Sequence, residues 1–165
     1  MIRSNKFLLA AGAAALSAGI YSASTFAASV TSTANATVIA PMTIAETQAL
    51  HFGDIAEDGG GTIALDASTG VRTPGAGTSV STGGGDQRGI YAITGVGSKT
   101  YSVSIPGVSL TGPGAPMAVT FTNDASGTLP AGGSDNIGVG GQITLGAGQT
   151  PGGYSASYTV TVDYN

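Results

Sequence analysis

The sequence lacks cysteine and tryptophan, has a single histidine, and carries charge on only 8% of its 165 residues. Without cysteine there is no disulfide framework, no thiolate metal ligand and no thiol nucleophile. A single histidine offers no ligand set for zinc, and no Ser/His/acid arrangement can be recognised. We therefore predict that the protein is not an enzyme and that it needs no cofactor or metal.

Basic residues are also scarce, and two of the five stand near the start of the sequence. Residues 1–27 open with Arg3 and Lys6, continue through an apolar run rich in Ala and Leu, and end at Ala27, which is the pattern of a secretory signal peptide. The run is too short and wrongly flanked for a membrane span. Cleavage after Ala27, or alternatively after Ala28, predicts an exported protein without a membrane span in its mature form.

The mature chain keeps three basic and nine acidic residues, a formal charge of −6. A surface that binds phosphates needs clustered Lys and Arg, so we expect no nucleic-acid partner. About 138 residues remain after cleavage, which suits one domain with a hydrophobic core.

Glycine, by contrast, is abundant, with 28 residues that separate short runs of alternating apolar and polar side chains. Alternation with a period of two is typical of half-buried strands, and glycine and proline between such runs mark turns. The runs are residues 50–55, 62–66, 89–94, 100–106, 117–123, 135–139 and 142–145. Between the last two stands Gly140-Gly141, which predicts a hairpin. The pattern predicts an all-β chain folded as a sandwich.

The clearest alternation lies in residues 153–165. Its apolar positions share one parity and are Tyr154, Ala156, Tyr158, Val160, Val162 and Tyr164. Polar residues fill most of the other parity, so we predict a half-buried strand. No further strand follows in the sequence to cover its far edge. Because an apolar strand with an open edge invites aggregation, we expect another strand to pair with it.

Residues 28–40 alternate more weakly and have small side chains. One parity holds Val30, Ser32, Ala34, Ala36 and Val38. Pro41, which has no amide hydrogen for a β-ladder, stops or kinks the segment. We predict an extended strand over residues 28–40.

Acidic residues gather at one turn, where Asp54, Glu57 and Asp58 precede or flank three glycines. This group could hold a weakly bound calcium ion, but its spacing fits neither an EF-hand loop nor the Gly-Gly-x-Gly-x-Asp repeat, and an ordinary acidic turn is the preferred interpretation. His51 lies on the polar parity of its run and is predicted to be solvated or to cap the backbone.

Taken together, these features resemble bacterial pilins of the chaperone-usher type. The resemblance rests on the signal peptide, the small-residue N-terminus, the Leu-x-Phe-Gly-x-Ile element at residues 50–55, the Gly-Gly hairpin and the final Gly-Tyr-x-x-x-Tyr-x-Val-x-Val-x-Tyr strand. The chain is most similar to a cysteine-free family of secreted domains of unassigned function that resembles the archaic and spore-coat-U-like pilins. The missing disulfide is its departure from better-known pilins.

The resemblance implies an incomplete immunoglobulin-like β-sandwich at residues 41–165, preceded by a donor strand at residues 28–40. In donor-strand complementation, the donor strand of one subunit fills the groove beside the C-terminal strand of the next. The inserted side chains would be Val30, Ser32, Ala34, Ala36 and Val38, and the acceptor strand would be the one that carries Tyr154, Ala156, Tyr158, Val160, Val162 and Tyr164.

Repeated head to tail, this interaction builds a homopolymeric fimbria on the cell surface that supports adhesion or biofilm. The implied partners are a periplasmic chaperone, which would hold the carboxylate of Asn165, and an outer-membrane usher.

Two alternatives stay open. Residues 28–40 could fold back as the first strand of their own domain, giving a secreted monomeric β-sandwich that acts as a binding or adhesin domain. A tip adhesin or carbohydrate-binding module would instead need an exposed aromatic cluster, for example one that includes Tyr91 or Tyr101.

Overall fold

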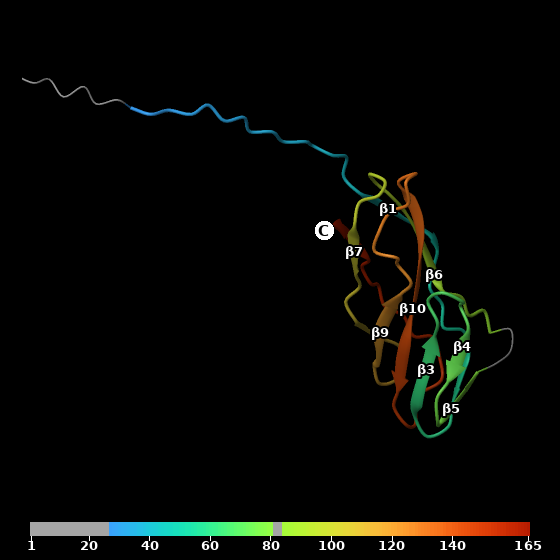
Figure 1. Cartoon of the computed structure of the whole chain (residues 1–165). Coiled ribbons are helices and arrows are strands. Elements are labelled where there is room, and N and C mark those ends of the chain that lie inside the picture. Colours follow the sequence, from blue (N-terminus) through green and yellow to red (C-terminus); the bar gives the residue numbers. More distant parts are fainter. Residues whose placement is uncertain (1–26, 81–83) are drawn as a thin grey trace, which may run out of the picture. The chain divides into compact units, whose positions relative to one another are not determined.

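The computed structural model describes residues 27–80 and 84–165 (Figure 1). All of the predicted signal peptide except Ala27 lies outside the described residues. The chain divides into two compact units, Met1–Ala36 and Thr37–Asn165. In the first unit, residues 27–36 have no regular secondary structure and are exposed. No helix in the described part of the chain is long and apolar enough to cross a membrane.

The second unit contains strands and no helix among its described residues, which confirms the all-β prediction. The strands are β1 (Thr43–Gln48), β2 (Ile55–Glu57), β3 (Gly61–Leu65), β4 (Arg72–Pro74), β5 (Thr78–Val80), β6 (Gly89–Thr94), β7 (Tyr101–Ser104), β8 (Val108–Leu110), β9 (Met117–Asn123), β10 (Ser134–Leu145) and β11 (Thr161–Tyr164). All pairs are antiparallel, and the sheets curl as in a β-sandwich (Figure 1).

The main sheet has seven strands and is organised around β10. Val139 of β10 pairs with both β6 and β9, and residues 141–144 pair with both β3 and β9. Strand β9 therefore runs along one edge of β10, while β6 and β3 follow each other along the opposite edge. Strands β1, β4 and β8 extend the sheet beside β6, β3 and β9. Strands β7 and β11 form a separate two-stranded sheet, and so do β2 and β5.

The hairpin predicted at Gly140-Gly141 is wrong, because β10 runs without a break through both glycines (Figure 1). These glycines allow a close approach of backbone instead of a turn. A Cβ atom on Gly140 would collide with the carbonyl oxygen of Leu65, and one on Gly138 would collide with that of Ala67. The chain that leaves β3 thus crosses directly over the outer face of β10.

The core has two clusters of buried side chains that meet at Phe121. The first consists of Tyr91, Ile93, Tyr101, Leu129, Ile137 and Val139. The second consists of Ile63, Met117, Val119, Ile143 and Leu145. Tyr91 and Tyr101 are both buried, so they form no exposed aromatic cluster of the kind that a carbohydrate-binding module would need.

Candidate strand-binding groove

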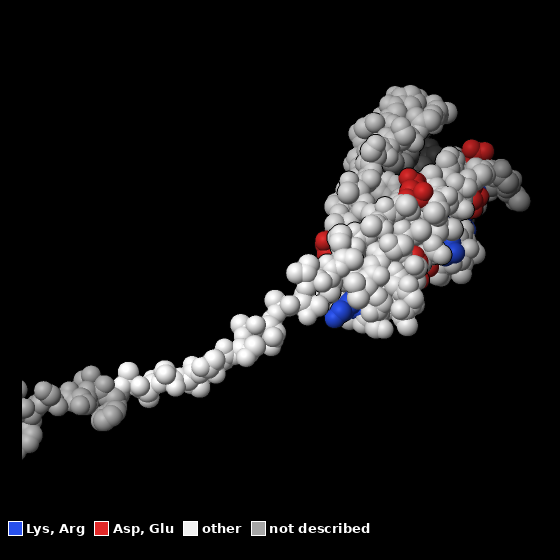
Figure 2. Space-filling view, turned by 90° about the horizontal axis from the view of Figure 1, so that it is seen from above, with Lys and Arg blue, Asp and Glu red and all other residues white. Residues whose placement is uncertain are grey.

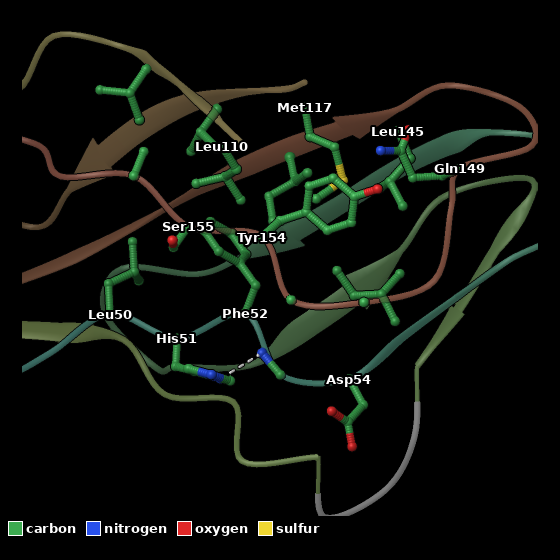
Figure 3. A pocket seen from close by; sticks show the side chains of 18 of the residues that line it. Leu50, His51, Phe52, Asp54, Leu110, Met117, Leu145, Gln149, Tyr154 and Ser155 are labelled. Carbon is green, nitrogen blue, oxygen red and sulfur yellow. Dashed lines mark hydrogen bonds between the residues drawn. The ribbon is translucent and has the colours of Figure 1, made fainter. Parts of the chain in front are cut away.

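A groove of about 710 Å³ lies between two segments that are far apart in the sequence, residues 50–56 and 149–158. Figure 3 shows the side chains that line it. Its floor is apolar and is made by Val108, Leu110, Met117, Val119, Phe121, Ile143 and Leu145. Several of these belong to the second core cluster, so the groove opens directly onto the hydrophobic core.

The first wall follows β1 and is irregular where a strand was predicted. Before β2 begins at Ile55, His51 forms an isolated bridge with Gln87, and the amide of Asp54 donates a hydrogen bond of 3.2 Å to the carbonyl oxygen of Gly84. Leu50 and Phe52 are half-buried and line the groove, as their parity predicts. The side chain of His51 is exposed, and its Nδ1 accepts a hydrogen bond from the amide of Gly53 at 3.0 Å, which agrees with a capping role (Figure 3).

A buried guanidinium holds this wall in place. The side chain of Arg72 is only 4% exposed and forms an ion pair of 3.2 Å with Asp86. Its Nη1 donates hydrogen bonds to the carbonyl oxygens of Phe52, at 2.7 Å, and Asp54, at 2.9 Å. Because both carbonyls belong to the wall, Arg72 couples its conformation to β4 on the main sheet.

The second wall is the C-terminal segment, which is a regular strand only over β11. Half-buried positions at Tyr154, Tyr158, Val160, Val162 and Tyr164 follow the predicted alternation. Ala156 is exposed, and it lines the open groove, where no described side chain covers it.

The backbone of this wall is largely unpaired. Ser155 exchanges two hydrogen bonds of 3.0 Å with Thr111, and β11 pairs with β7. Between them, the backbone of residues 156–160 forms no hydrogen bond to any other described residue. Strand β11 therefore has β7 on one side and no described strand on the other, which leaves that edge open to a further strand.

The backbone N–H and C=O groups of this wall that have no partner among the described residues lie along one edge of the segment. The amide of Asn165 donates to the carbonyl oxygen of Thr100, its direct partner, at 3.1 Å. Hydrogen-bonded and non-hydrogen-bonded pairs alternate in an antiparallel ladder, so the odd-numbered residues of β11 face β7. Ser155 is also odd and also faces inward to Thr111. The even-numbered residues 156–164 therefore direct their N–H and C=O groups to the opposite, open edge.

Tyr158 anchors this wall to the core. Its ring stacks on Phe121 with ring centroids 4.5 Å apart, and its hydroxyl lies 2.6 Å from that of Tyr91. Burial, with a further contribution from the hydrogen bond to Tyr91, raises the pKa of Tyr158 above its usual value. Burial likewise raises the pKa of Tyr91. Sequence analysis identified both tyrosines but gave no sign that they meet, because they lie 67 positions apart.

This tyrosine pair predicts alkaline sensitivity. Above the ordinary tyrosine pKa of 10.0, an unfolded chain loses protons that folded Tyr158 and Tyr91 retain, so stability falls as pH rises. We expect Tyr158→Phe to lower the free energy of unfolding by about 1 kcal/mol at neutral pH, because the hydrogen bond to Tyr91 is lost. Above pH 10, the free energy of unfolding of this variant should fall less steeply with pH than that of the unchanged protein. Urea denaturation between pH 8 and pH 11.5 measures this, and an unchanged slope in Tyr158→Phe would contradict it.

The predicted donor segment is exposed throughout. Val30 is 91% exposed and Val38 is 96% exposed, and Ser32, Ala34 and Ala36 are exposed as well. No residue between positions 28 and 41 belongs to a strand. The segment carries no charged side chain, as its white surface in Figure 2 shows. Chemically it is an uncharged chain with small side chains that has no partner strand among the described residues.

No group of three or more metal-ligating side chains occurs in the part of the chain that the structure describes. Asp54 and Asp58 are exposed, and Figure 3 shows Asp54 pointing away from the apolar floor of the groove. The groove therefore offers an apolar floor beside polar side chains such as Gln149, Thr150 and Ser155, and among the described residues its charged or basic lining side chains are His51 and Asp54, both exposed.

The fold and the groove define an all-β domain of antiparallel sheets in which the C-terminal segment leaves a strand edge unpaired among the described residues, beside a groove with an apolar floor. The chain belongs to the family described as Domain of unknown function (DUF4402), whose model matches residues 42–164. The matched range includes every described strand and both walls of the groove, and it leaves out residues 28–40. Neither the curated proteins nor the solved structures compared with the chain include a match.

Proposed function

We propose that the domain is an incomplete immunoglobulin-like sandwich and that the protein is a structural subunit of a bacterial surface pilus. Residues 28–40 of one subunit fill the groove of the next by donor-strand complementation. The observation that carries this proposal is the unpaired backbone edge at residues 156–164, whose first part, Ala156 and Tyr158, lines a groove with an apolar floor that opens onto the core.

The chemistry of residues 28–40 suits this groove. A strand that packs against the apolar floor of the groove must bring no unpaired charge, because burying one costs several kcal/mol. Residues 28–40 have none, and their even-numbered side chains are small enough to lie between two walls. The segment also precedes the family domain, so it can leave its own subunit without removing any strand of that domain.

The energetics favour a slow, durable association. A donor of about ten residues forms roughly ten main-chain hydrogen bonds, each worth about 1 kcal/mol net. Burial of the valine and alanine side chains adds about 25 cal/mol for each Å² of apolar surface. The inserted strand can leave only when the sandwich opens, so the filament is kinetically stable.

Assembly on the cell surface needs helpers of the kind that the resemblance implies. A periplasmic chaperone protects the same open edge before polymerisation, because an exposed edge strand otherwise aggregates. Its basic residues hold the carboxylate of Asn165, whose side chain is exposed and whose amide pairs with Thr100. An outer-membrane usher then exports the growing fimbria, which supports adhesion or biofilm.

The test compares the mature protein with a version that lacks residues 28–40, by electron microscopy and size-exclusion chromatography after refolding at high concentration. We expect fibres from the full chain. The truncated chain should stay subunit-sized, and a synthetic peptide of residues 28–40 should raise its melting temperature. A full chain that stays monomeric, with residues 28–40 protected from proteolysis, would instead establish the secreted monomeric sandwich.

Two point variants serve as matched probes of the same step. Ala34→Asp places a charge on the side-chain face that enters the groove and should abolish fibres. Asn35→Asp places the same charge on the neighbouring, solvent-facing position and should leave fibres intact. Equal loss of fibres in both variants would contradict insertion of one defined face.

A further inference from the structure

One charged side chain, that of Glu46, lies on the core-facing side of β1, the strand that leads into the first wall of the groove. We propose that Glu46 is a charged gate, which slows the entry of an uncharged strand into the groove until its carboxylate is neutralised. The gate rests on the proposed function, because it controls the step in which one subunit accepts the strand of another.

The pairing of β1 with β6 places Glu46 on the inner side of the main sheet. Glu46 lies directly opposite Tyr91, and Ile44 lies directly opposite Ile93. Opposite residues of an antiparallel pair have their side chains on the same face, and Tyr91 and Ile93 both belong to the first core cluster. Glu46 is nevertheless exposed, and Ile44 is 37% exposed. The core-facing side of β1 is therefore not covered by the described residues.

The carboxylate lies near the tyrosine pair that anchors the second wall. Burial is the main cause of the raised pKa of Tyr91 and of Tyr158, and the negative charge of Glu46 adds to the rise of both. Glu46 forms no ion pair with any described residue, so only water screens its charge. An uncompensated charge thus lies close to the wall that carries the unpaired edge.

A strand that enters the groove changes the surroundings of this charge. Strand β1 has β6 on one side and no described strand on the other. Residues 28–40 of another subunit would cover Tyr158 and exclude water beside Glu46, and they carry no charged side chain to compensate it. Loss of hydration without a new ion pair is costly. Inward-pointing charges protect exposed strand edges from pairing in many sheets, and Glu46 stands in such a position.

Acid removes this charge. The titratable side chains that face Glu46 are Tyr91 on β6 and Tyr158 on the second wall, and both are uncharged at and below neutral pH. Asp135 on β10 shares the same face one strand further away, where its Oδ2 accepts a hydrogen bond of 3.3 Å from the hydroxyl of Tyr101. Protonation of Glu46 therefore removes the charge of the gate, and strand entry should accelerate as the pH falls.

The test follows fibre growth of the full mature chain by light scattering and electron microscopy after refolding. At about pH 7.5, Glu46→Gln should assemble at least about tenfold faster than the unchanged protein, because a small part of the desolvation penalty of an ion suffices for this factor. Glu46→Ala should behave in the same way. At about pH 3.5, where a glutamate side chain is mostly protonated, the advantage of both variants should disappear.

Two controls separate a gate from general repulsion between acidic subunits. Asp58→Asn removes one negative charge from an exposed side chain outside the lining of the groove, and it should assemble at the unchanged rate. Glu46→Lys lowers the net negative charge by two but keeps a charge at the same place. It should therefore assemble no faster than the unchanged protein at about pH 7.5.

The outcomes distinguish the gate from the proposed function. Equal rates for Glu46→Gln and the unchanged protein at about pH 7.5, or acceleration by Glu46→Lys or Asp58→Asn as large as that by Glu46→Gln, would overturn the gate and leave the pilus subunit standing. An absence of fibres from every variant at both pH values would overturn the proposed function, and the gate with it.

Discussion

Replacing Arg72 by methionine is expected to cost about 3 kcal/mol of folding stability, within the range found when one partner of a buried ion pair is removed. The Arg72 side chain is 4% exposed, and its loss leaves Asp86 without its ion pair and two wall carbonyls, those of Phe52 and Asp54, without their donor. Methionine keeps much of the apolar volume of the side chain, so the loss reports the polar interactions.

Arg88→Met is the matched control for this measurement. Arg88 also donates to backbone carbonyls, those of Ala67 and Ser68, and its ion pair with Asp124 is longer, at 3.5 Å. Its side chain is 29% exposed, so water can replace part of what is lost, and we expect a cost of about 1 kcal/mol. Urea denaturation measures the free energy of unfolding of both variants, and an unchanged m-value shows that the unfolding transition itself has not changed. Equal costs would show that Arg72 does not hold the wall.

If the groove binds a donor strand as proposed, the loss of Arg72 should also weaken that binding. With residues 52–54 no longer tied to β4, the groove loses one of its two fixed sides. We expect the truncated Arg72→Met subunit to bind the peptide of residues 28–40 more weakly than truncated Arg88→Met, at a temperature where both are folded.

Gly140→Ala is the second change with a large expected effect, a loss of about 3 kcal/mol or more, at the upper end of the range for overpacking. The new methyl group would meet the carbonyl oxygen of Leu65 and the backbone of Asp66 and Ala67, which cannot move without breaking the pairing of β3 with β10. Thermal unfolding followed by circular dichroism would show a fall in melting temperature of more than 10 °C for a domain of this size.

Gly132→Ala is the control for that loss. A Cβ atom there meets nothing within 4 Å, and the backbone of Gly132 does not have positive φ. Alanine should therefore be neutral or slightly stabilising, because it lowers the entropy of the unfolded chain. A Gly140→Ala protein as stable as Gly132→Ala would mean that the chain does not cross closely over β10.

Individual strands were predictable where alternation was uninterrupted. The runs at residues 89–94 and 117–123 coincide with β6 and β9, because each pairs along its length and buries one face. The role of Gly140-Gly141 could not be predicted from the sequence. A glycine that allows a tight turn and a glycine that allows another chain segment to cross closely look the same in a sequence. The residues next to a glycine in the sequence do not show whether it forms a turn or packs against another segment of backbone.

The candidate groove was predictable only in part. Alternation indicated Tyr154, Tyr158, Val160 and Val162 as one apolar face, and these residues do line or support the second wall. The first wall and its support by Arg72 left no recognisable sequence signal, because a lone arginine near a turn usually lies at the surface. Its burial depends on the carbonyls of residues 52 and 54 and on Asp86, which reach it only through the fold.

The sequence by itself determined that this chain is all-β, that its core is aliphatic and aromatic without disulfides, and that residues 28–40 and 153–165 alternate between two kinds of side chain. These are local properties, because a period of two and the turn residues between strands act over a few positions. Only the tertiary structure decided where the open edge lies and which backbone groups face it. That depends on long-range pairing, in which β7 takes one edge of β11 and no described strand takes the other.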